Sequence, residues 1–354
     1  YDVPQPFGIG IADLNGDGKL DLAVTDDRYN TVAVLFGNGN ATFGNQLDVR
    51  TAAGPLSLAV GDFNGDGKAD LAAADYGDSV SVLLGNGDGT FGTRMDYGTG
   101  GGPVSIATAD LDGDGHSDLV VANGNSSTVS AFSGVGDGTF GAKRDYLFGG
   151  TPGCVALSDV SGDGRVDMVV STHIGLSVLL GNGDGTFGAS HDYPSGALPT
   201  SYSIPGLAIA DLNRDGRQDI AVVNNYYANT VSVLLGIGDG TFGAPHDFST
   251  GDTPVGLAIA DLNGDSAADL IVTNFGGSSV SVFTGHGDGT FDARRDFATG
   301  TEPSSVTIRD LDGDLMLDVA VSNTNAHNRL VPLRASTISV LLGSGTGSFG
   351  AKTD

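Results

Sequence analysis

Acidic residues recur along this chain in a fixed nine-residue pattern. Aspartates occupy positions one, five and nine, and Asn, Asp or Ser occupies position three. The first copy is residues 13–21, DLNGDGKLD, and the other copies open at Asp62, Asp110, Asp159, Asp211, Asp261 and Asp310. Dense carboxylate and amide oxygens in a glycine-rich turn are the ligands that Ca²⁺ prefers. Without a cation these carboxylates would repel one another. The pattern therefore predicts up to seven Ca²⁺ sites.

Five positions of each copy are candidate ligands. We expect side-chain oxygens from positions one, three, five and nine, and the backbone carbonyl of position seven, to contact the ion. The candidates are Asp13, Asn15, Asp17, Lys19 and Asp21; Asp62, Asn64, Asp66, Lys68 and Asp70; Asp110, Asp112, Asp114, His116 and Asp118; Asp159, Ser161, Asp163, Arg165 and Asp167; Asp211, Asn213, Asp215, Arg217 and Asp219; Asp261, Asn263, Asp265, Ala267 and Asp269; and Asp310, Asp312, Asp314, Met316 and Asp318. Mg²⁺ fits less well because it demands stricter octahedral geometry, and Zn²⁺ because no His or Cys side chain is a candidate donor.

The seven copies differ in detail. Ser161 is a weaker donor at position three of the fourth copy, whereas Asp112 and Asp312 add a carboxylate to the third and seventh copies. Position six is Gly in five copies but Ser266 in the sixth and Leu315 in the seventh. If this position requires a positive φ angle, Leu315 is strained. Occupancy of the sixth and seventh loops is therefore left open.

The spacing of the copies predicts the fold. Successive copies open 49, 48, 49, 52, 50 and 49 residues apart, with repeats starting near residues 7, 56, 104, 153, 205, 255 and 304. The second repeat contains four strand-like segments, at 57–61, 71–74, 79–84 and 94–97. Four strands in each of seven such repeats predict an all-β, seven-bladed propeller, one domain over residues 1–354, with four-stranded antiparallel blades. Each acidic loop would join the first and second strands of a blade, and helix should be nearly absent. A β-solenoid or tandem sandwich is the alternative.

The two ends of the chain carry a further prediction. Residues 350–354, GAKTD, repeat the internal segment 141–145, GAKRD, which is followed by the start of the next repeat. The N-terminal residues therefore continue the repeat where the C-terminal residues stop, as in a ring cut between an outer strand and the next inner strand. We expect Tyr1 and Asp354 to lie close together and blade seven to keep its own outer strand. Because Tyr1 already lies in repeat material, the natural precursor can be longer.

Composition excludes several kinds of partner. The formal net charge is -27 and the pI is about 4.1, which argues against nucleic acid and anionic membrane surfaces as partners. No apolar run reaches the ~18 residues of a membrane span, so we expect no membrane insertion. The single cysteine, Cys154, excludes an internal disulfide and is expected to be a small buried residue.

At this point the chain resembles the FG-GAP, or VCBS, repeat family, whose members include the propeller heads of integrin α subunits. The residues that carry the resemblance are Phe43-Gly44 with Ala53-Gly54-Pro55, Phe91-Gly92 with Gly101-Gly102-Pro103, Phe140-Gly141 with Thr151-Pro152, and Phe242-Gly243 with Thr253-Pro254. Some fungal propeller lectins, with sugar pockets between blades, and some polysaccharide lyases look similar. The resemblance implies a propeller and bound calcium. It implies function only weakly, because one fold hosts many functions.

Irregular segments indicate where a ligand would bind. In such blades the acidic loop and the hairpin of the GNGDGTF type share one face of the ring. Departures from the repeat concentrate on the other face, at residues 196–205, 224–229 and 323–336. Aromatic and amide side chains there suit sugar stacking or a protein partner. The candidate ligand-binding residues are Tyr202, Tyr226, Tyr227, His327 and Arg329, and Tyr29, Tyr76, His173 and Phe275 lie in equivalent loops.

Four functions remain open from the sequence, one of which is a pure scaffold within a longer surface protein. The first is a calcium-stabilised extracellular binding or adhesion module for glycan or protein, secreted or at the cell surface and expected to be monomeric. The second is a multivalent lectin with interblade sugar sites. The third is a polysaccharide lyase-type enzyme with its site on the face that carries the insertions of repeats five and seven. An enzyme is less favoured, because we find no catalytic constellation that the repeat does not explain.

Overall fold

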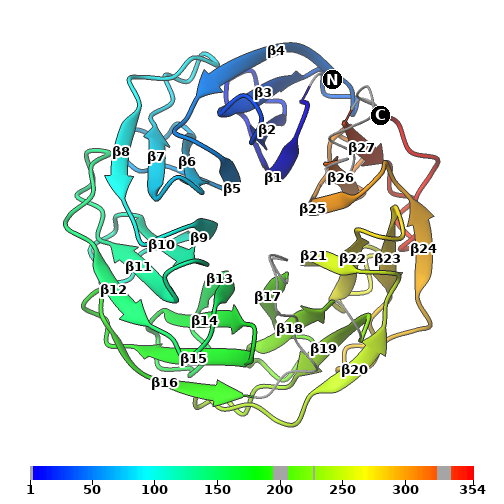
Figure 1. The fold of residues 1–354 in the computed structure, drawn as a ribbon. Coiled ribbons are helices and arrows are strands. Elements are labelled where there is room, and N and C mark those ends of the chain that lie inside the picture. Colours follow the sequence, from blue (N-terminus) through cyan, green and yellow to red (C-terminus); the bar gives the residue numbers. More distant parts are fainter. Residues whose placement is uncertain (1–2, 194–205, 226–227, 325–335) are drawn as a thin grey trace.

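The computed structural model describes residues 3–193, 206–225, 228–324 and 336–354. Every secondary-structure element in these residues is a β-strand, and the strands form seven separate sheets arranged as a ring (Figure 1). The predicted all-β, seven-bladed propeller is therefore confirmed. None of the described segments forms a helix of the length and apolarity that a membrane crossing would require.

The strands follow one another from the inside of each blade to its outer edge. Blades one and two are β1 (Pro6–Ala12), β2 (Asp21–Asp26), β3 (Thr31–Gly37), β4 (Phe43–Arg50), β5 (Pro55–Gly61), β6 (Asp70–Asp75), β7 (Ser79–Leu83) and β8 (Met95–Gly98). Blades three and four are β9 (Pro103–Ala109), β10 (Asp118–Asn123), β11 (Thr128–Phe132), β12 (Arg144–Leu147), β13 (Pro152–Ser158), β14 (Asp167–Thr172), β15 (Gly175–Gly181) and β16 (Phe187–Tyr193). The others are β17 (Leu207–Ala210), β18 (Asp219–Asn224), β19 (Thr230–Leu234), β20 (His246–Ser249), β21 (Pro254–Ala260), β22 (Asp269–Asn274), β23 (Ser279–Phe283), β24 (Arg295–Ala298), β25 (Pro303–Arg309), β26 (Asp318–Asn323) and β27 (Thr337–Leu341).

Burial explains the strand patterns. The second strand of every blade is buried along its whole length, because it lies between two strands of its own sheet and between the neighbouring blades. Such strands have apolar residues on both faces, as in the LAAA segment of β6. The fourth strands are largely exposed and polar. The four strands predicted for the second repeat differ from β5–β8 by two residues or fewer at each end.

The apolar core is divided among the contacts between blades. Seven clusters of buried residues each join one blade to the next, such as Val34 of blade one with Leu71 and Leu83 of blade two. Because each sheet buries its two faces against its neighbours, removal of one blade would expose two such clusters. The ring is therefore stabilised as a unit.

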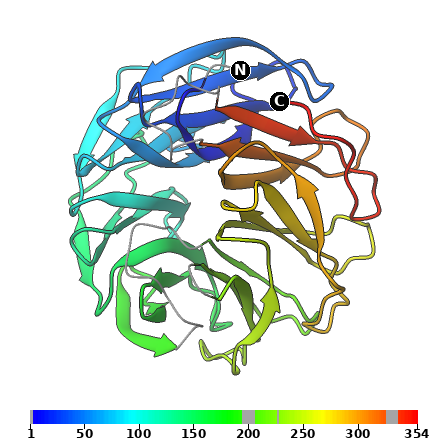
Figure 2. The same ribbon diagram turned by 45° about the vertical axis from the view of Figure 1, so that its right-hand side comes forward.

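The ring closes by packing blade one directly against blade seven. Val3 and Ile9 share a core cluster with Leu311 and Ile338, and the Ser322 hydroxyl donates to the Phe7 carbonyl (2.6 Å). The ends of the chain lie side by side in both views (Figure 1, Figure 2). This agrees with the predicted closeness of the termini, although Tyr1 itself lies outside the described residues.

The predicted outer strand of blade seven is reduced to a single bridge. Blade seven has three strands, and Val340 and Thr353 exchange two backbone hydrogen bonds (2.8 and 2.9 Å) where the other blades have a fourth strand. Among the described residues, the C-terminal segment fills this position, as expected for a blade seven that keeps its own outer strand.

The propeller has two distinct faces. On the first, which we call the acidic-loop face, the loop between the first two strands contacts the hairpin between the last two, since the Gly85 N–H donates to Asp70 Oδ1 (2.7 Å). The second, the channel-mouth face, carries the turns between strands two and three and the connections between blades, which meet where the Tyr76 N–H donates to the Gly54 carbonyl (2.8 Å). Both placements match the prediction.

Candidate functional sites: the acidic loops and the channel mouth

Each acidic loop is held by hydrogen bonds from its backbone to its own side chains. In the first loop, Asp13 accepts from the N–H groups of Gly16 (2.7 Å) and Gly18 (2.8 Å). Asn15 accepts from the N–H of Asp17 (2.9 Å), and Asp17 in turn accepts from the N–H at position seven. These bonds turn the side chains of positions one, three and five toward the inside of the loop, as metal ligation would require.

The same scheme recurs around the ring. In all seven loops the N–H of position six donates to the carboxylate of position one, and the N–H of position seven donates to that of position five. Position six has a positive φ in every loop, including Ser266 (66°) and Leu315 (69°). The Leu315 side chain is 92% exposed, so no packing offsets its backbone strain. The predicted strain at this residue is confirmed.

The carboxylate at position nine has a further role that the sequence did not show. Asp70 is fully buried; its Oδ2 accepts from the N–H of Phe63 in the loop (2.8 Å), and its Oδ1 from the N–H of Gly85 in the hairpin (2.7 Å). Burial raises the pKa of this carboxyl, the two N–H donors lower it, and the nearby Asp66 and Asp62 raise it again. All seven position-nine residues join loop to hairpin in this way, so this residue is structural whether or not it also contacts a metal.

The donors fit a hard cation best in two loops. In the third loop Asp110, Asp112 and Asp118 each place one carboxylate oxygen within 4.8 Å of the others, and in the seventh Asp310, Asp312 and Asp314 do the same. No other three acidic, His or Cys residues converge in this way within the described part of the chain. The difference follows from position three, where these two loops have Asp and the other five have Asn or Ser.

The sixth loop is contacted by a cation from its neighbour. Arg214 occupies position four of the fifth loop, and its guanidinium donates to the carbonyls of Asp265 (2.7 Å) and Ser266 (3.1 Å) in the sixth loop. The pKa of Asp265 is lowered, chiefly by the Ala267 N–H, then by Asn263, with the charge of Arg214 adding to the effect. The sixth loop therefore differs electrostatically from the other loops, in addition to its Ser at position six.

The inner strands surround a cavity that opens on the channel-mouth face. It has a volume of about 910 Å³, and residues of all seven blades line it. Its wall contains a ring of small residues, five positions before each acidic loop: Gly8, Ser57, Ser105, Cys154, Gly206, Gly256 and Ser305. Small residues are required because the inner strands approach closely; a Cβ atom at Gly206 would lie 2.7 Å from the backbone of Val255 and Leu257.

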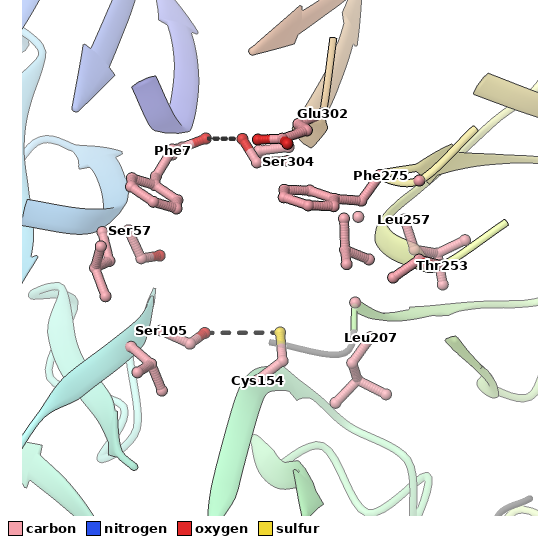
Figure 3. Close-up of a pocket in the computed structure, with 18 of the residues that line it drawn as sticks. Phe7, Ser57, Ser105, Cys154, Leu207, Thr253, Leu257, Phe275, Glu302 and Ser304 are labelled. Carbon is pink, nitrogen blue, oxygen red and sulfur yellow. Dashed lines mark hydrogen bonds between the residues drawn. The ribbon is translucent and has the colours of Figure 1, made fainter. Parts of the chain in front are cut away.

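Two aromatic rings project toward the open centre of this cavity (Figure 3). Phe7 lies at the start of β1, and Phe275 lies in the turn after β22. Glu302, in the connection to blade seven, is the one charged residue among the described residues of the wall. The Ser105 hydroxyl lies 3.6 Å from the thiol of Cys154.

The structure corrects the prediction that Cys154 is buried. The sequence predicted a buried residue, but part of Cys154 reaches the cavity wall, because the inner strand of its blade borders the channel. The thiol itself is enclosed by protein on most sides, and this burial raises its pKa. It is therefore a small wall residue whose thiol is held in the neutral form by burial.

All five ligand-binding residues predicted from the sequence lie outside the described residues. These are Tyr202, Tyr226, Tyr227, His327 and Arg329, and they remain predictions. Of the aromatic residues in equivalent loops, Phe275 lines the cavity, whereas Tyr29 and Tyr76 do not. Sequence reasoning missed Phe7 and Glu302. Phe7 could have been found as the large residue at a position where other blades carry Leu56, Val104 or Ser304.

Fold and loops together define a β-propeller with acidic loops on one face and a channel-mouth cavity on the other. The chain belongs to the FG-GAP-like repeat family, which matches it over residues 13–73, 62–121, 110–170, 159–222, 211–272 and 262–321. None of the curated proteins compared with the chain matches it significantly.

Several solved structures share the fold. A lectin of Agrocybe aegerita, described as recognising non-reducing terminal N-acetylglucosamine, is 26% identical, covers 84% of this chain and 81% of its own, and has a TM-score of 0.60. Hydrazine synthase of Kuenenia stuttgartiensis is 17% identical over 97% of each chain, with a TM-score of 0.64. The BBS1N chain, solved in complex with ARL6DN, is 12% identical over 92% of this chain and 89% of its own, with a TM-score of 0.60. The last two likenesses concern the fold alone.

Proposed function

We propose that this protein is an extracellular, calcium-stabilised binding module whose ligand is a glycan, bound on the channel-mouth face. The observation that carries the proposal is the contrast between the faces. On the acidic-loop face, the repeated carboxylates at positions one and nine hold the loops and hairpins. On the other face, a hydroxyl-lined cavity carries two aromatic rings.

The chemistry of the cavity suits a sugar. Sugars present apolar C–H faces, which pack on aromatic rings, and hydroxyl groups, which bond to hydroxyl and carboxylate side chains. Phe7 and Phe275 supply the first kind of contact, and Ser and Thr side chains and Glu302 supply the second. The Agrocybe aegerita lectin supports this class of ligand, because it is the relative with the highest identity among those named above.

Calcium is proposed as a structural ion. The donor set in each loop consists of oxygens, and in the third and seventh loops three carboxylates converge. A bound ion would cancel the repulsion among them and stabilise the folded ring by mass action. Extracellular calcium concentrations suit loops of this exposed, moderate-affinity kind. The proposed location outside the cell rests on this argument.

A glycan array tests the proposal. The protein is applied with millimolar Ca²⁺ and, separately, after dialysis against a chelator. Binding of neutral glycans in calcium is the expected result, with weaker binding in chelator because the ring is destabilised. A blank array in calcium, with a protein that melts cooperatively, would exclude glycan recognition.

A protein ligand is the second candidate. The observation that favours it is the exposure of aromatic side chains on the channel-mouth face, Tyr29 at 56% and Tyr76 at 37%. Aromatic residues are enriched at protein interfaces. A lyase-type enzyme receives no such support, since its predicted residues lie outside the described part of the chain.

A further inference from the structure

The sequence contains two Asn-x-Ser/Thr triplets, and they lie on opposite faces of the ring. Asn40-Ala41-Thr42 belongs to the hairpin of blade one on the acidic-loop face, and Asn125-Ser126-Ser127 belongs to a turn of blade three on the channel-mouth face. Such triplets are acceptors of asparagine-linked glycans in proteins that enter a secretory pathway. Because so short a motif arises by chance, the surroundings of each asparagine have to decide between them.

Asn40 lies at the tip of its hairpin, and its side chain forms a turn with Thr42. Asn40 Oδ1 accepts from the backbone N–H of Thr42 (3.2 Å) and from the Thr42 hydroxyl (2.6 Å). Because the amide group is planar, Nδ2 lies on the side of the group opposite to Thr42. Both residues are exposed, and within the described part of the chain Asn40 Nδ2 donates no hydrogen bond. A sugar on this nitrogen would therefore project into solvent without breaking a hydrogen bond of the fold.

Five other blades form the same turn with aspartate in place of asparagine. Asp88 of blade two, for example, accepts from the N–H (3.0 Å) and the hydroxyl (2.6 Å) of Thr90. The remaining aspartates at this position, each bonded to the threonine two residues later, are Asp137, Asp184, Asp239 and Asp288. The hairpin therefore does not require asparagine. What asparagine adds in blade one is an amide nitrogen that can carry a sugar.

Asn125 is instead engaged with the neighbouring blade. Its Nδ2 donates to the Tyr76 hydroxyl of blade two (3.0 Å), and its backbone N–H donates to the Gly101 carbonyl (2.9 Å). The side chain also packs directly against Gly102, where a Cβ atom would clash with Asn125 Nδ2. A sugar on this nitrogen would displace the side chain from the connection between blades two and three. The fold thus accommodates a glycan on Asn40 and opposes one on Asn125.

We propose that Asn40 carries an asparagine-linked glycan. In the transfer reaction Asn40 Nδ2 forms a bond to the anomeric carbon of an oligosaccharide that is held on a lipid diphosphate. The bond between that carbon and the diphosphate oxygen breaks, the lipid diphosphate leaves with the electron pair, and Nδ2 loses one proton. The transferase and the lipid-linked donor belong to the secretory pathway, so this inference rests on the extracellular location in the proposed function.

The position of Asn40 determines which face the glycan covers. Its hairpin adjoins blade seven, since the Ala41 N–H donates to the Leu311 carbonyl in the seventh acidic loop (3.0 Å), beside the place where the ring closes (Figure 1). A glycan there is a bulky, hydrophilic group on the acidic-loop face. Ligand binding on the channel-mouth face should therefore not depend on it.

Peptide mapping by mass spectrometry tests the proposal. The full chain is secreted from a eukaryotic host behind a signal peptide, purified from the medium in millimolar Ca²⁺ and digested. The expected result is a glycan on the peptide that contains Asn40. An amidase that releases such glycans leaves aspartate at the site. The treated parent protein and untreated Asn40→Asp should therefore have the same mass and the same melting temperature.

Asp88→Asn is the matched control, because it creates the same kind of triplet in the same turn of blade two. It should acquire one further glycan, whereas Asn125→Gln should leave the glycans of the secreted protein unchanged. The assignment is wrong if Asp88→Asn is modified and Asn40 is not, if neither hairpin is modified, or if Asn125 alone carries the glycan. A blank glycan array would refute the proposed ligand and leave this assignment standing, because occupancy of Asn40 is measured on the protein itself.

Discussion

The two ends of strand β6 hold buried carboxylates in opposite electrostatic situations. Asp70 begins the strand on the acidic-loop face, and Asp75 ends it on the channel-mouth face; both are 0% exposed. Asp70 accepts two backbone N–H bonds, one on each oxygen. Asp75 Oδ2 accepts from the Ser81 hydroxyl (2.7 Å), and its Oδ1 has no hydrogen-bond partner among the described residues. Burial raises the pKa of both, and that of Asp75 reaches about 7.

Blade three shows the residue that ordinarily occupies the position of Asp75, at the end of the second strand. Asn123 replaces the aspartate and donates to the hydroxyls of Thr128 (3.1 Å) and Ser130 (2.9 Å), and Ser130 donates to Asp145 (2.6 Å). In blade two the single Ser81 proton faces two carboxylates, Asp75 and Asp96, with Arg94 paired to Asp96. A protonated Asp75 would donate to Ser81 as the asparagine does. The comparison teaches that backbone N–H groups receive the buried carboxylate at one end of the strand, whereas burial without such donors raises the pKa of Asp75 to about 7 at the other end.

The largest expected effect concerns the acidic-loop face as a whole. Removal of calcium by a chelator should lower the melting temperature strongly, because seven sites with dissociation constants of ~0.1–1 mM would contribute roughly 3–10 kcal/mol in millimolar calcium. Differential scanning calorimetry in calcium and in EDTA measures the change, with MgCl₂ as a control for ionic effects. An unchanged melting temperature would refute the structural role of calcium.

The second largest effect on stability is expected from the loss of one position-nine carboxylate, which joins the acidic loop to the hairpin. Asp70→Ala leaves the buried N–H groups of Phe63 and Gly85 without acceptors, at roughly 1–3 kcal/mol each. Chemical denaturation in saturating calcium should show a destabilisation of roughly 2–6 kcal/mol. Asp292→Ala, which removes an exposed hairpin carboxylate, is the control and should change stability by less than about 0.5 kcal/mol. Equal stability of the two variants would contradict the role assigned to Asp70.

The third effect depends on pH and separates the two ends of β6. The folded-state pKa of Asp75, about 7, exceeds its ordinary value of 3.8. Between these two pH values the folded protein therefore keeps the Asp75 proton, whereas the unfolded chain loses it. The stability contributed by this group is complete below pH ~4 and is lost as pH rises toward 7, by roughly 2–4 kcal/mol. Asp75→Asn should therefore be more stable than the parent at pH 8, with a difference that vanishes near pH 4.

The converse substitution in blade three sharpens this test. Asn123→Asp should introduce the same pH-dependent loss, since its partner Ser130 already donates to Asp145. Urea unfolding at a series of pH values measures both variants against the parent protein, so that titration of the acidic loops cancels. A difference between Asp75→Asn and the parent that does not vary with pH would show that Asp75 is not protonated in the fold.

The smallest effect concerns strain in the seventh loop. Leu315→Gly relieves a positive φ of 69° at an exposed side chain and should stabilise the protein by up to about 1 kcal/mol. Gly18→Leu, at the same position of the first loop, should destabilise by a similar amount, because a Cβ there meets no atom within 4 Å and the cost is conformational. Thermal melts in saturating calcium measure both. Opposite signs are required; a destabilising Leu315→Gly would imply that the leucine makes a contact in solution.

The repeat in the sequence was by itself enough to predict the architecture. A regular period of acidic loops, with four short strands between them, left few folds open, and the strand positions of the second repeat were correct to within two residues. The glycine pattern also predicted the positive φ of Leu315. These features are local or periodic, because turn chemistry and strand alternation depend on residues close together in the sequence.

Only the tertiary structure decided what the repeat positions do in space. The hydrogen bond from Gly85 to Asp70 spans strands β6 and β7 and the turn between them, and it gives a predicted metal ligand a structural role. Phe7, Phe275 and Glu302 line one cavity because blades one, six and seven surround the same axis, and no local pattern in the sequence shows that these side chains share a wall. The sequence by itself determined the number and kind of blades; convergence of distant residues on the ring axis required the closed ring.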